Sequence, residues 1–561
     1  MSLILLVLCL FLNNINTDIN YRFLPDWEAK NKEFCGTGVA LADINGDGWD
    51  DLIIANGNDM LVQTITIYYN NGNGSFPDYP SWESDDSNYH GHISVGDING
   101  DGWIDLAASV FLGENRFDSP GWVKIYYNQQ GELSKYPDWR SSETFFNFSC
   151  ILGDVNQDGK LDLVTACGEG YYHASQKHYN RIFLNNGSGL NTTSSWQDIN
   201  GDNSMDVFFV DIDKDGDLDL FVANEKASDK IYFNNNGTLN TSPDWQSTES
   251  NRAANSVFCA DFNRDGYIDV AVSDNKQTTQ GGYFKLYLNT NGSLSRDVHW
   301  KNNIIDYGSS IALVDANGDD YLDYFAGSWW GEVKIFLKEG NSFHINPDFE
   351  SLTSSVIEAY YFGDVNKDGL RDTTEVFVLP NSTFRALYLR NNFWHRINSL
   401  KRNGIDFKSY CSMPDQGWVS LGGSIAAGDT IEINYTYSSR LDFVVSNWDY
   451  ASNSPGDYLF LFYGSSNFKD EFSKNKIPYR ISFNIFPNPA DYWVSMKFNV
   501  QEGNIKVYDI SGRMINEWNI NKEKQIFWNL TDKKGIVISK GLYFVVLNTD
   551  EKTVVRKFVK N

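Results

Sequence analysis

The sequence lacks an excess of basic residues, and no long apolar run follows its first residues. Lys and Arg total 46 against 73 Asp and Glu, which gives a formal net charge of -27 at pH 7. Such a chain is repelled by the phosphates of nucleic acids and by anionic lipid surfaces. We therefore expect no nucleic-acid partner and no transmembrane segment in the mature chain.

The main apolar run covers residues 3–12 (LILLVLCLFL), and the polar residues 13–20 follow it. Ten apolar residues are too few to span a bilayer, but they suit the hydrophobic core of a signal peptide. We expect residues 1–19 to be a signal peptide, and the protein to be secreted or attached to the outer cell surface.

Cysteine is scarce, with 6 residues in 561. Loss of Cys9 with the leader leaves an odd number, which does not favour a disulfide framework. Cys150 and Cys167 flank one predicted hairpin, so a disulfide across it stays open. Two buried thiols are the preferred interpretation.

Familiar catalytic signatures are missing as well: the sequence has no G-x-S-x-G, H-E-x-x-H, Walker loop or sialidase Asp-box. Aromatic residues, by contrast, make up 15% of the chain, and glycines number 45. This composition favours strands and turns over helices. We predict an all-β fold.

A nine-residue acidic motif recurs seven times, with starts at residues 43, 97, 154, 211, 261, 315 and 364. The first copy reads DINGDGWDD. A short β-type run precedes each copy, a second follows most copies, and a third ends in Asn-Gly turn chemistry. An aromatic residue about fifteen positions before each motif marks an outer fourth strand. These aromatic residues are Trp27, Trp82, Trp139, Trp196, Trp245, Trp300 and Phe349.

Four strands in about fifty residues form one blade of a β-propeller. We therefore predict a seven-bladed β-propeller over residues 20–390. Because the segment around Trp27 precedes the first motif, we expect it to complete the seventh blade and close the ring. The recurring aromatic residues should pack between neighbouring blades.

Positions 1, 3, 5 and 9 of each motif carry Asp or Asn, a set of oxygen donors that selects a hard cation such as Ca²⁺. Gly at position 6 permits a sharp turn that brings the carbonyl of position 7 inward. We expect up to seven Ca²⁺ ions. The predicted ligands are Asp43, Asn45, Asp47, Trp49, Asp51, Asp97, Asn99, Asp101, Trp103, Asp105, Asp154, Asn156, Asp158, Lys160, Asp162, Asp211, Asp213, Asp215, Asp217, Asp219, Asp261, Asn263, Asp265, Tyr267, Asp269, Asp315, Asn317, Asp319, Tyr321, Asp323, Asp364, Asn366, Asp368, Leu370 and Asp372.

The main competing interpretation is an EF-hand, which needs Glu at position 12 and flanking helices. Six copies have an apolar residue or Thr there, and only the seventh has an acid, Glu375, which leaves a dockerin-like interpretation of that loop open. The sixth copy has Asp320 in place of Gly, so we expect a weaker site. A near-copy at residues 198–206 lies between an outer and an inner strand, and we expect it not to bind metal.

On these motifs, residues 24–390 resemble the FG-GAP/VCBS repeats of integrin α-subunit propellers and of many exported bacterial proteins. The resemblance implies a seven-bladed propeller with Ca²⁺ at the loops between the first two strands of the blades. It also implies that the ligand face is the opposite one. It implies no particular activity, because this fold serves many functions.

Residues 391–465 continue in β-type runs without a motif, and we expect either a β-rich module or a degenerate blade. Within them RLDFVVSNWD, from Arg440, echoes the strand that follows each acidic motif. Residues 466–480 are expected to form a charged linker.

Residues 481–561 predict an immunoglobulin-like β-sandwich with turns at Ser511-Gly512 and Lys534-Gly535. Through Pro487-Asn488-Pro489 and Gly541-Leu542-Tyr543-Phe544 they resemble the C-terminal sorting domain of type IX secretion cargo, which implies the secretion machinery as a partner. A plain accessory sandwich is the alternative.

The strand ends opposite the acidic loops are rich in rings, which suit contact with a glycan or protein but also fill gaps between blades. These residues are Tyr89, His90, His92, Phe117, Tyr171, Tyr172, His173, Trp329 and Trp330. The leading hypothesis is a calcium-dependent adhesion or glycan- or protein-binding module with no catalytic residue. The alternative is a polysaccharide lyase or hydrolase, which would bring His90, His92, His173, Lys177 and His178 together in one pocket.

Overall fold

The computed structural model describes residues 19–463 except 32, 171, 174, 188, 251, 278–281 and 450–455, and residues 483–560 except 487–492, 499–501, 510–512, 522–524 and 549–552. The chain divides into two compact units, 1–468 and 469–561. Every regular element in the described part is a strand, as the predicted all-β class requires. No helix among these residues is long and apolar enough to cross a membrane. The expected linker, and the signal peptide apart from Ile19, lie outside the described residues.

Six sheets of the first unit each contain four antiparallel strands in sequence order. The first consists of β2 (Gly36–Ala42), β3 (Asp51–Asn56), β4 (Thr66–Tyr68) and β5 (Trp82–Glu83). The others are β6 (Tyr89–Gly96), β7 (Asp105–Gly113), β8 (Arg116–Tyr126) and β9 (Trp139–Arg140); β10 (Asn147–Gly153), β11 (Asp162–Cys167), β12 (Arg181–Phe183) and β13 (Trp196–Gln197); β14 (Asn203–Val210), β15 (Asp219–Ala227), β16 (Lys230–Tyr232) and β17 (Trp245–Gln246); β18 (Arg252–Ala260), β19 (Asp269–Asp274), β20 (Phe284–Tyr287) and β23 (Trp300–Lys301); and β24 (Gly308–Val314), β25 (Asp323–Ser328), β26 (Gly331–Phe336) and β29 (Phe349–Ser355). Pairing of β15 with β18 joins the fourth and fifth sheets. Two small hairpins, β21 (Asn289–Thr290) with β22 (Ser293–Leu294) and β27 (Lys338–Glu339) with β28 (Ser342–Phe343), lie beside the fifth and sixth sheets in the sequence.

The seventh sheet combines distant parts of the chain. Its strands are β30 (Ile357–Gly363), β38 (Asp442–Asn447), β39 (Tyr458–Phe460) and, at the edge, β1 (Trp27–Glu28). Trp27 pairs with Leu459. The segment around Trp27 therefore completes the last sheet, as its place before the first motif predicts.

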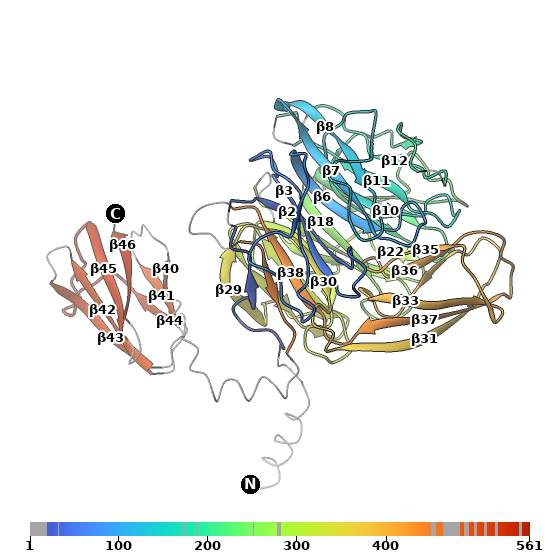
Figure 1. Cartoon of the computed structure of the whole chain (residues 1–561). Coiled ribbons are helices and arrows are strands. Elements are labelled where there is room, and N and C mark those ends of the chain that lie inside the picture. Colours follow the sequence, from blue (N-terminus) through green and yellow to red (C-terminus); the bar gives the residue numbers. More distant parts are fainter. Residues whose placement is uncertain are drawn as a thin grey trace, which may run out of the picture. The chain divides into compact units, whose positions relative to one another are not determined.

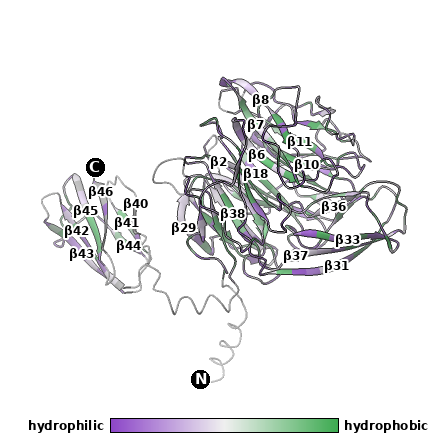
Figure 2. Ribbon diagram, viewed as in Figure 1, coloured by the Kyte–Doolittle hydropathy of each residue, from purple (hydrophilic) through white to green (hydrophobic). Residues whose placement is uncertain are grey.

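The first strands of the seven sheets contact one another in sequence order, and β30 contacts β2 to complete the circle. This closed cycle is the arrangement of a β-propeller. Figure 1 labels several of these first strands, among them β2, β6, β10, β18 and β30. Inner strands such as β10, β18 and β38 contain many hydrophobic residues (Figure 2). Each first strand is the edge of its sheet that faces the ring axis, and the neighbouring sheets pack against both of its faces.

The strands do not follow the division expected at residue 390. An insertion, residues 370–438, leaves the ring after β30 and returns before β38, so part of 391–465 belongs to the insertion and part to the seventh sheet. Motif spacing alone assumes that the second strand follows the loop directly, and here it does not. The insertion has one sheet of β31 (Leu370–Val378), β37 (Thr430–Ser438), β33 (Arg396–Arg402) and β34 (Ile405–Asp406), and one of β32 (Ala386–Tyr388), β36 (Trp418–Leu421) and β35 (Tyr410–Met413).

The recurring aromatic residues pack between neighbouring sheets, as predicted. Six of the seven outer-strand rings contact a ring on the third strand of the next sheet: the centroids of Trp196 and Tyr232 are 5.5 Å apart, and those of Trp245 and Tyr287 are 5.9 Å apart. The seventh, Phe349, stacks on Phe23 at 5.2 Å. The pairs Trp27–Tyr68, Trp82–Tyr126, Trp139–Phe183 and Trp300–Phe336 continue the series.

Truncation of one of these aromatic side chains should lower the stability of the propeller strongly. Trp300 is 7% exposed and contacts Tyr324, Phe336 and Phe343 at 5.4, 5.6 and 5.1 Å between centroids. We expect Trp300→Ala to lower the free energy of unfolding by about 3–5 kcal/mol, measured by denaturant titration. Trp330→Ala is the matched control, because Trp330 is 55% exposed, and it should cost less than about 1.5 kcal/mol. Equal losses in the two variants would contradict this assignment.

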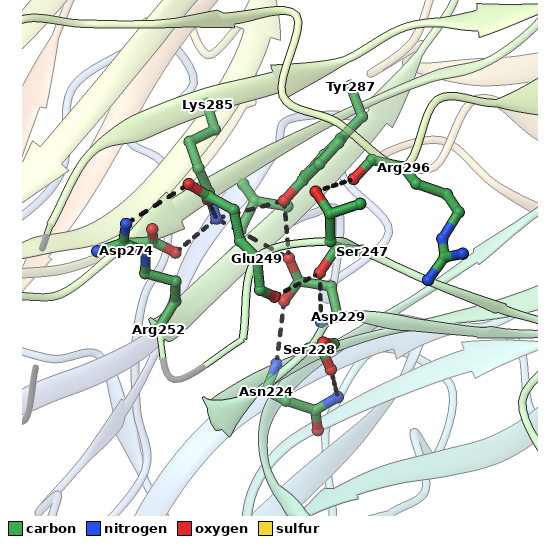
Figure 3. Close-up of polar contacts among 12 residues, drawn as sticks. Asn224, Ser228, Asp229, Ser247, Glu249, Arg252, Asp274, Lys285, Tyr287 and Arg296 are labelled. Carbon is green, nitrogen blue, oxygen red and sulfur yellow. Dashed lines mark hydrogen bonds and ion pairs between the residues drawn. The ribbon is translucent and has the colours of Figure 1, made fainter.

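Buried ion pairs also link neighbouring sheets. The Lys285 ammonium on β20 lies 2.9 Å from Asp274 Oδ1, 3.3 Å from Glu249 Oε2 and 3.9 Å from Asp229 Oδ2 (Figure 3). Burial alone lowers the pKa of Lys285, but the surrounding carboxylates, Asp274 first, hold it well above its usual value. The cluster therefore keeps a fully buried cation charged.

The cysteines in the described residues are free, and Cys150 and Cys167 are buried thiols, the preferred of the two interpretations.

The second unit contains one sheet of β40 (Phe483–Phe486), β41 (Val494–Phe498) and β44 (Gln525–Trp528), and another of β43 (Met514–Asn521), β42 (Glu502–Asp509), β45 (Gly541–Asn548) and β46 (Thr553–Lys560). The two sheets share a core that includes Met496, Val507 and Val545. They form a β-sandwich, and its immunoglobulin-like topology stays a prediction.

Candidate metal centre

Six of the seven acidic motifs form the tight loop between the first and second strands of a sheet, and the insertion interrupts the seventh. The position-1 carboxylate organises the loop: Asp43 Oδ2 accepts the Gly48 N–H (2.8 Å), and Asp211 Oδ2 accepts the Gly216 N–H (3.0 Å). Positions 4 and 6 adopt positive φ, 64° at Lys214 and 95° at Gly216. This backbone turns the side chains of positions 1, 3 and 5 toward one another.

The position-9 carboxylate anchors the loop to the sheet. Asp51 Oδ2 accepts the Ile44 N–H (3.2 Å) from position 2, and its Oδ1 accepts the Asn70 N–H (2.9 Å) from the third strand's exit. The same pair of bonds forms at Asp105, Asp162, Asp219 and Asp323. At Asp269 only Oδ1 is bonded in this way, and Oδ2 is buried without a hydrogen-bond partner.

Burial perturbs these carboxylates. It raises the pKa of Asp51 and of Asp105 to about 7. At Asp211 burial, followed by the repulsion of Asp215, raises the pKa to about 8. Crowded carboxylates with raised pKa values are stabilised by a positive partner. Among the described residues, Asp51, Asp105 and Asp211 have no ion-pair partner, whereas in the third loop Lys160 Nζ lies 2.8 Å from Asp158 Oδ2.

The donor set fits a hard cation. Carboxylate oxygens of Asp211, Asp213 and Asp215 lie within 4.8 Å of one another. In the first loop, Asp43 Oδ1 is shielded from solvent and has no hydrogen-bond partner. Oxygen donors alone, with one left unpaired, suit Ca²⁺ rather than a softer metal. An acidic cluster able to hold a metal ion is thus present.

The seventh loop departs from the predicted residues. Asp372 lies on β31, is exposed, and accepts hydrogen bonds from Thr436 Oγ1 (2.6 Å) and Asn398 Nδ2 (3.2 Å), away from the loop. Asp442 instead occupies position 9, because it pairs with Gly363 as Asp51 pairs with Ala42. Sequence reasoning missed Asp442, and the signal that would have found it is the RLDF echo at Arg440. By the same register Arg440, not Leu370, stands at position 7.

The structure also shows the contacts of three other motif residues: the acid at position 12 of the seventh motif, the Asp in place of Gly in the sixth, and the first Asp of the near-copy at residues 198–206. Glu375 lies on β31 and accepts the Tyr435 hydroxyl (2.6 Å), so it is not part of the loop. Asp320 adopts a φ of 76° and its N–H donates to Asp315 Oδ2 (2.8 Å), as Gly does in the other loops. In the near-copy, Asp198 Oδ2 accepts from Asn180 (2.8 Å) and from the Tyr232 hydroxyl (3.3 Å).

Neighbouring loops are coupled around the ring. Asn185 Nδ2 donates to Ile98 O (2.7 Å) in the preceding loop and to Leu161 O (3.1 Å) in its own. The equivalent bonds come from Asn70, Asn128, Asn234 and Asn289. The sequence suggests only turn chemistry for these asparagines. Position-4 cations add to the coupling: Lys367 Nζ lies 4.0 Å from the ring centroid of Trp49 in the next loop.

The insertion covers part of the loop end of the ring. Ser420 Oγ donates to Asp154 Oδ2 (2.7 Å), and the Ala386 N–H donates to Gly216 O (2.8 Å). A cleft of about 650 Å³ lies between the insertion and the loops of the first, second, third and seventh sheets. Its lining includes Asp43, Asp97, Lys160, His395, Lys408 and Tyr410. A second cavity of about 120 Å³ follows the ring axis and is lined by the first strands together with Phe393 and Asp415 of the insertion.

The aromatic residues predicted to contact a glycan or protein lie at the strand ends opposite the acidic loops. They form two separate groups. Phe117 and Tyr172 lie 4.6 Å apart between ring centroids, and Phe117 O lies 2.6 Å from His173 Nε2. Tyr89 joins this group through Arg116, whose guanidinium lies 5.9 Å from the Tyr89 centroid. Tyr172 is 72% exposed. Tyr171 lies outside the described residues.

The second group contains three tryptophans. The centroids of Trp329 and Trp330 are 6.0 Å apart, and both rings lie about as close to Trp448. Trp330 is exposed, but Trp329 is buried and its Nε1 donates to Glu358 Oε2 (2.6 Å). Burial raises the pKa of Glu358 to about 8. Trp329 is therefore a core residue of this group, and Trp330 faces solvent.

The imidazoles of His90 and His92 do not lie beside that of His173. His90 is buried, with Nδ1 2.7 Å from Asn56 O, and burial lowers its pKa. His92 lines the axial cavity, and burial lowers its pKa to about 4. His173 bonds Phe117 instead, and among the described residues no hydrogen bond joins it to His90 or His92. The geometry expected of a catalytic histidine cluster is not found there.

Comparisons with known proteins agree with this architecture. Residues 43–108 and 211–272 match the FG-GAP-like repeat, and residues 484–561 match a secretion system C-terminal sorting domain. Mouse integrin alpha-3 is 32% identical over 118 residues, 18% of this chain and 10% of the relative. Human integrin alpha-7 is 31% identical over 106 residues, 18% of this chain and 8% of the relative.

The chain thus spans about a tenth of the length of these integrin relatives. Among solved structures, that of BBS1N in complex with ARL6DN covers 64% of this chain and 92% of its own at 15% identity, with a TM-score of 0.38. The chain carries FG-GAP-like repeats similar to those of integrin α subunits and a C-terminal sorting domain of a secretion system, and it is therefore an exported protein, secreted or attached to the outer surface.

Proposed function

We propose that the acidic loops bind calcium, with up to seven ions per chain. Support comes from the oxygen-only donors, from the unpaired Asp43 Oδ1 and from the close carboxylates of Asp211, Asp213 and Asp215. Bound Ca²⁺ would supply positive charge that lets the buried position-9 carboxylates stay ionised. Calcium thus acts as a structural element that fixes the loop ends of the sheets.

We further propose that the ring is an extracellular adhesion or binding module for a glycan or protein. One observation carries this proposal: Tyr172 is 72% exposed beside Phe117 and His173, at the strand ends opposite the loops. An exposed ring next to hydrogen-bonding groups suits a saccharide or a peptide. The local similarity to integrin α subunits is consistent with such a role, and the sorting domain provides for contact with the secretion machinery.

A glycan array probed with and without EDTA tests the binding role and its calcium dependence together. We expect Tyr172→Ala to weaken binding of the selected glycan at least about tenfold, because exposed aromatic anchors dominate such contacts. Tyr79→Ala is the matched control: Tyr79 is 62% exposed on the turn before an outer strand, away from the predicted group. Equal binding by both variants, or a parent protein that binds no glycan on the array, would count against a glycan site at Tyr172.

A polysaccharide lyase or hydrolase stays the second hypothesis, but no specific observation favours it. Such an enzyme needs a base and a charge-stabilising group beside one substrate. His90 and His92 are engaged in the interior, whereas His173 and His178 lie near each other, with His178 Nε2 3.3 Å from His173 O.

A further inference from the structure

The insertion, residues 370–438, interrupts the seventh acidic motif directly after Gly369. In the other six sheets the chain continues from position 6 directly to the position-9 carboxylate that opens the second strand. After Gly369, however, the chain enters β31, where Leu370 pairs with Ser438. The Ser439 N–H donates to Gly369 O (3.1 Å). The two ends of the insertion, 370–438, therefore meet inside the motif.

Asp442 has the same surroundings as the position-9 carboxylates of the uninterrupted loops. The Val365 N–H donates to Asp442 Oδ2 (3.0 Å), and the Phe462 N–H donates to its Oδ1 (2.7 Å). In the sixth loop the corresponding bonds to Asp323 are 3.0 and 2.8 Å long. Asp442 is 1% exposed. The loop thus has its full set of carboxylates in spite of the break in the sequence.

We propose that the seventh metal site is split: Asp364, Asn366 and Asp368 come from before the insertion, and Asp442 comes from after it. A metal ion there ties together the two chain ends between which the insertion emerges. This inference rests on the proposed calcium binding by the uninterrupted loops. It assigns no role in the site to Asp372, which the nine-residue motif would select.

Contacts within the loop make the insertion sensitive to this metal. Ser438, the last residue of β37, donates through Oγ to Asp364 Oδ2 (2.8 Å). The Arg440 guanidinium lies 3.3 Å from Asp368 Oδ2, and Asp368 itself is only partly buried. Asp364 and Asp442, both buried, share this base with Asp368, so their like charges repel one another when no cation lies between them. We therefore expect β31 and β37 to loosen at this end when the site is empty.

The insertion also forms one wall of the 650 Å³ cleft, whose other wall contains Asp43, Asp97 and Asp364. Phe393 of the insertion packs on Phe258 (5.9 Å between centroids) and on Phe362 (5.2 Å), which lie on first strands of the ring. A metal that holds the base of the insertion thereby holds the cleft in its present form.

The test compares Asp442→Asn with Asp372→Asn in the full chain, with bound calcium per chain measured by equilibrium dialysis. We expect Asp442→Asn to bind one calcium fewer than the parent and Asp372→Asn to bind the same number. Hydrogen exchange should become at least about tenfold faster in the first half of β31 and the last half of β37 for Asp442→Asn alone. Because Asp442 is buried, Asp368→Asn at a partly exposed position is a second variant with the same two expected outcomes.

The inference is overturned if Asp372→Asn loses a calcium, or if Asp442→Asn and Asp368→Asn both retain the parent's number. It is also overturned if one calcium is lost while exchange in β31 and β37 does not change. A parent protein that binds no calcium in any loop would overturn the proposed function itself. A parent that binds calcium normally, with unaffected variants, would overturn only the split site.

Discussion

In excess EDTA the thermal unfolding midpoint of the ring falls on the order of 10–20 °C below its value in millimolar calcium. Each site at a hundredfold excess of ligand over its Kd adds about 2.7 kcal/mol to the folded state. Several such contributions reach the whole stability of an ordinary domain, about 5–15 kcal/mol. Without metal, moreover, buried carboxylates such as Asp51 and Asp211 have raised pKa values, which is a cost to the folded state.

Scanning calorimetry measures this shift, and the protein contains its own control. The sandwich within residues 469–561 has no acidic motif, so its transition should not move with calcium. Mg²⁺ should restore the midpoint only partly, because it is smaller and gives up its water reluctantly. An unchanged melting curve in excess EDTA would exclude a structural role for calcium in the loops.

Lys285→Met should lower the free energy of unfolding at pH 7 by about 3–5 kcal/mol, because it leaves buried carboxylates without their cation. Lys285 is fully buried, and among the described residues it is the one cation within ion-pair distance of Asp274. Asp229 and Glu249 lose the same partner (Figure 3). The variant therefore loses the attraction of these ion pairs and is also left with buried carboxylates that have no cation. These carboxylates must either stay ionised without a partner or take up protons.

The loss should depend on pH. Burial raises the pKa of Asp274 to about 6, above its unfolded value of about 3.9. The folded state thus binds the Asp274 proton more tightly than the unfolded state does. The ionised carboxylate therefore lowers the free energy of unfolding above the folded-state pKa, and this loss disappears below the unfolded-state pKa. Without Lys285 that folded pKa rises further. The deficit of Lys285→Met relative to the parent should therefore be smaller at pH 5 than at pH 8.

Denaturant titration at both pH values measures this difference. Lys301→Met is the matched control, since Lys301 pairs with Lys285 across the sheet but is exposed and lies over the Tyr283 ring. It should cost at most about 1 kcal/mol, with no dependence on pH between 5 and 8. Similar losses for the two lysines would show that the buried cluster contributes nothing specific.

The periodic part of the fold was predictable because each unit contains its own signals. The acidic loop, the Asn-Gly turn and an outer aromatic residue such as Trp245 recur in one order, and each has a local physical reason. The closing role of Trp27 followed from counting these units. The carboxylates of the uninterrupted loops were likewise predictable as a converging set, because the spacing within nine residues determines the turn.

What the sequence did not reveal depends on contacts between distant segments. Asp372 matched the motif and Asp442 did not, because spacing is read along the chain whereas position 9 is defined by pairing with Gly363. Similarly, Trp329 and Trp330 are adjacent in sequence, yet one is buried over Glu358 and the other faces solvent. Burial of this kind depends on how sheets pack and cannot be derived from residue type.

Closure of the seventh sheet by β1 governs when the fold can be completed. Tyr21 donates to Leu441 O across 420 positions of sequence, and the Leu461 N–H donates to Asp26 across 435. Contacts of such long range form late, since the entropy of ordering the intervening chain must be lost first. Until β1 arrives, β39 presents a bare edge to which a strand of another molecule can add. The segment around β1 thus completes the ring last, and folding to the native ring requires both ends of the propeller to be present on the same side of the membrane.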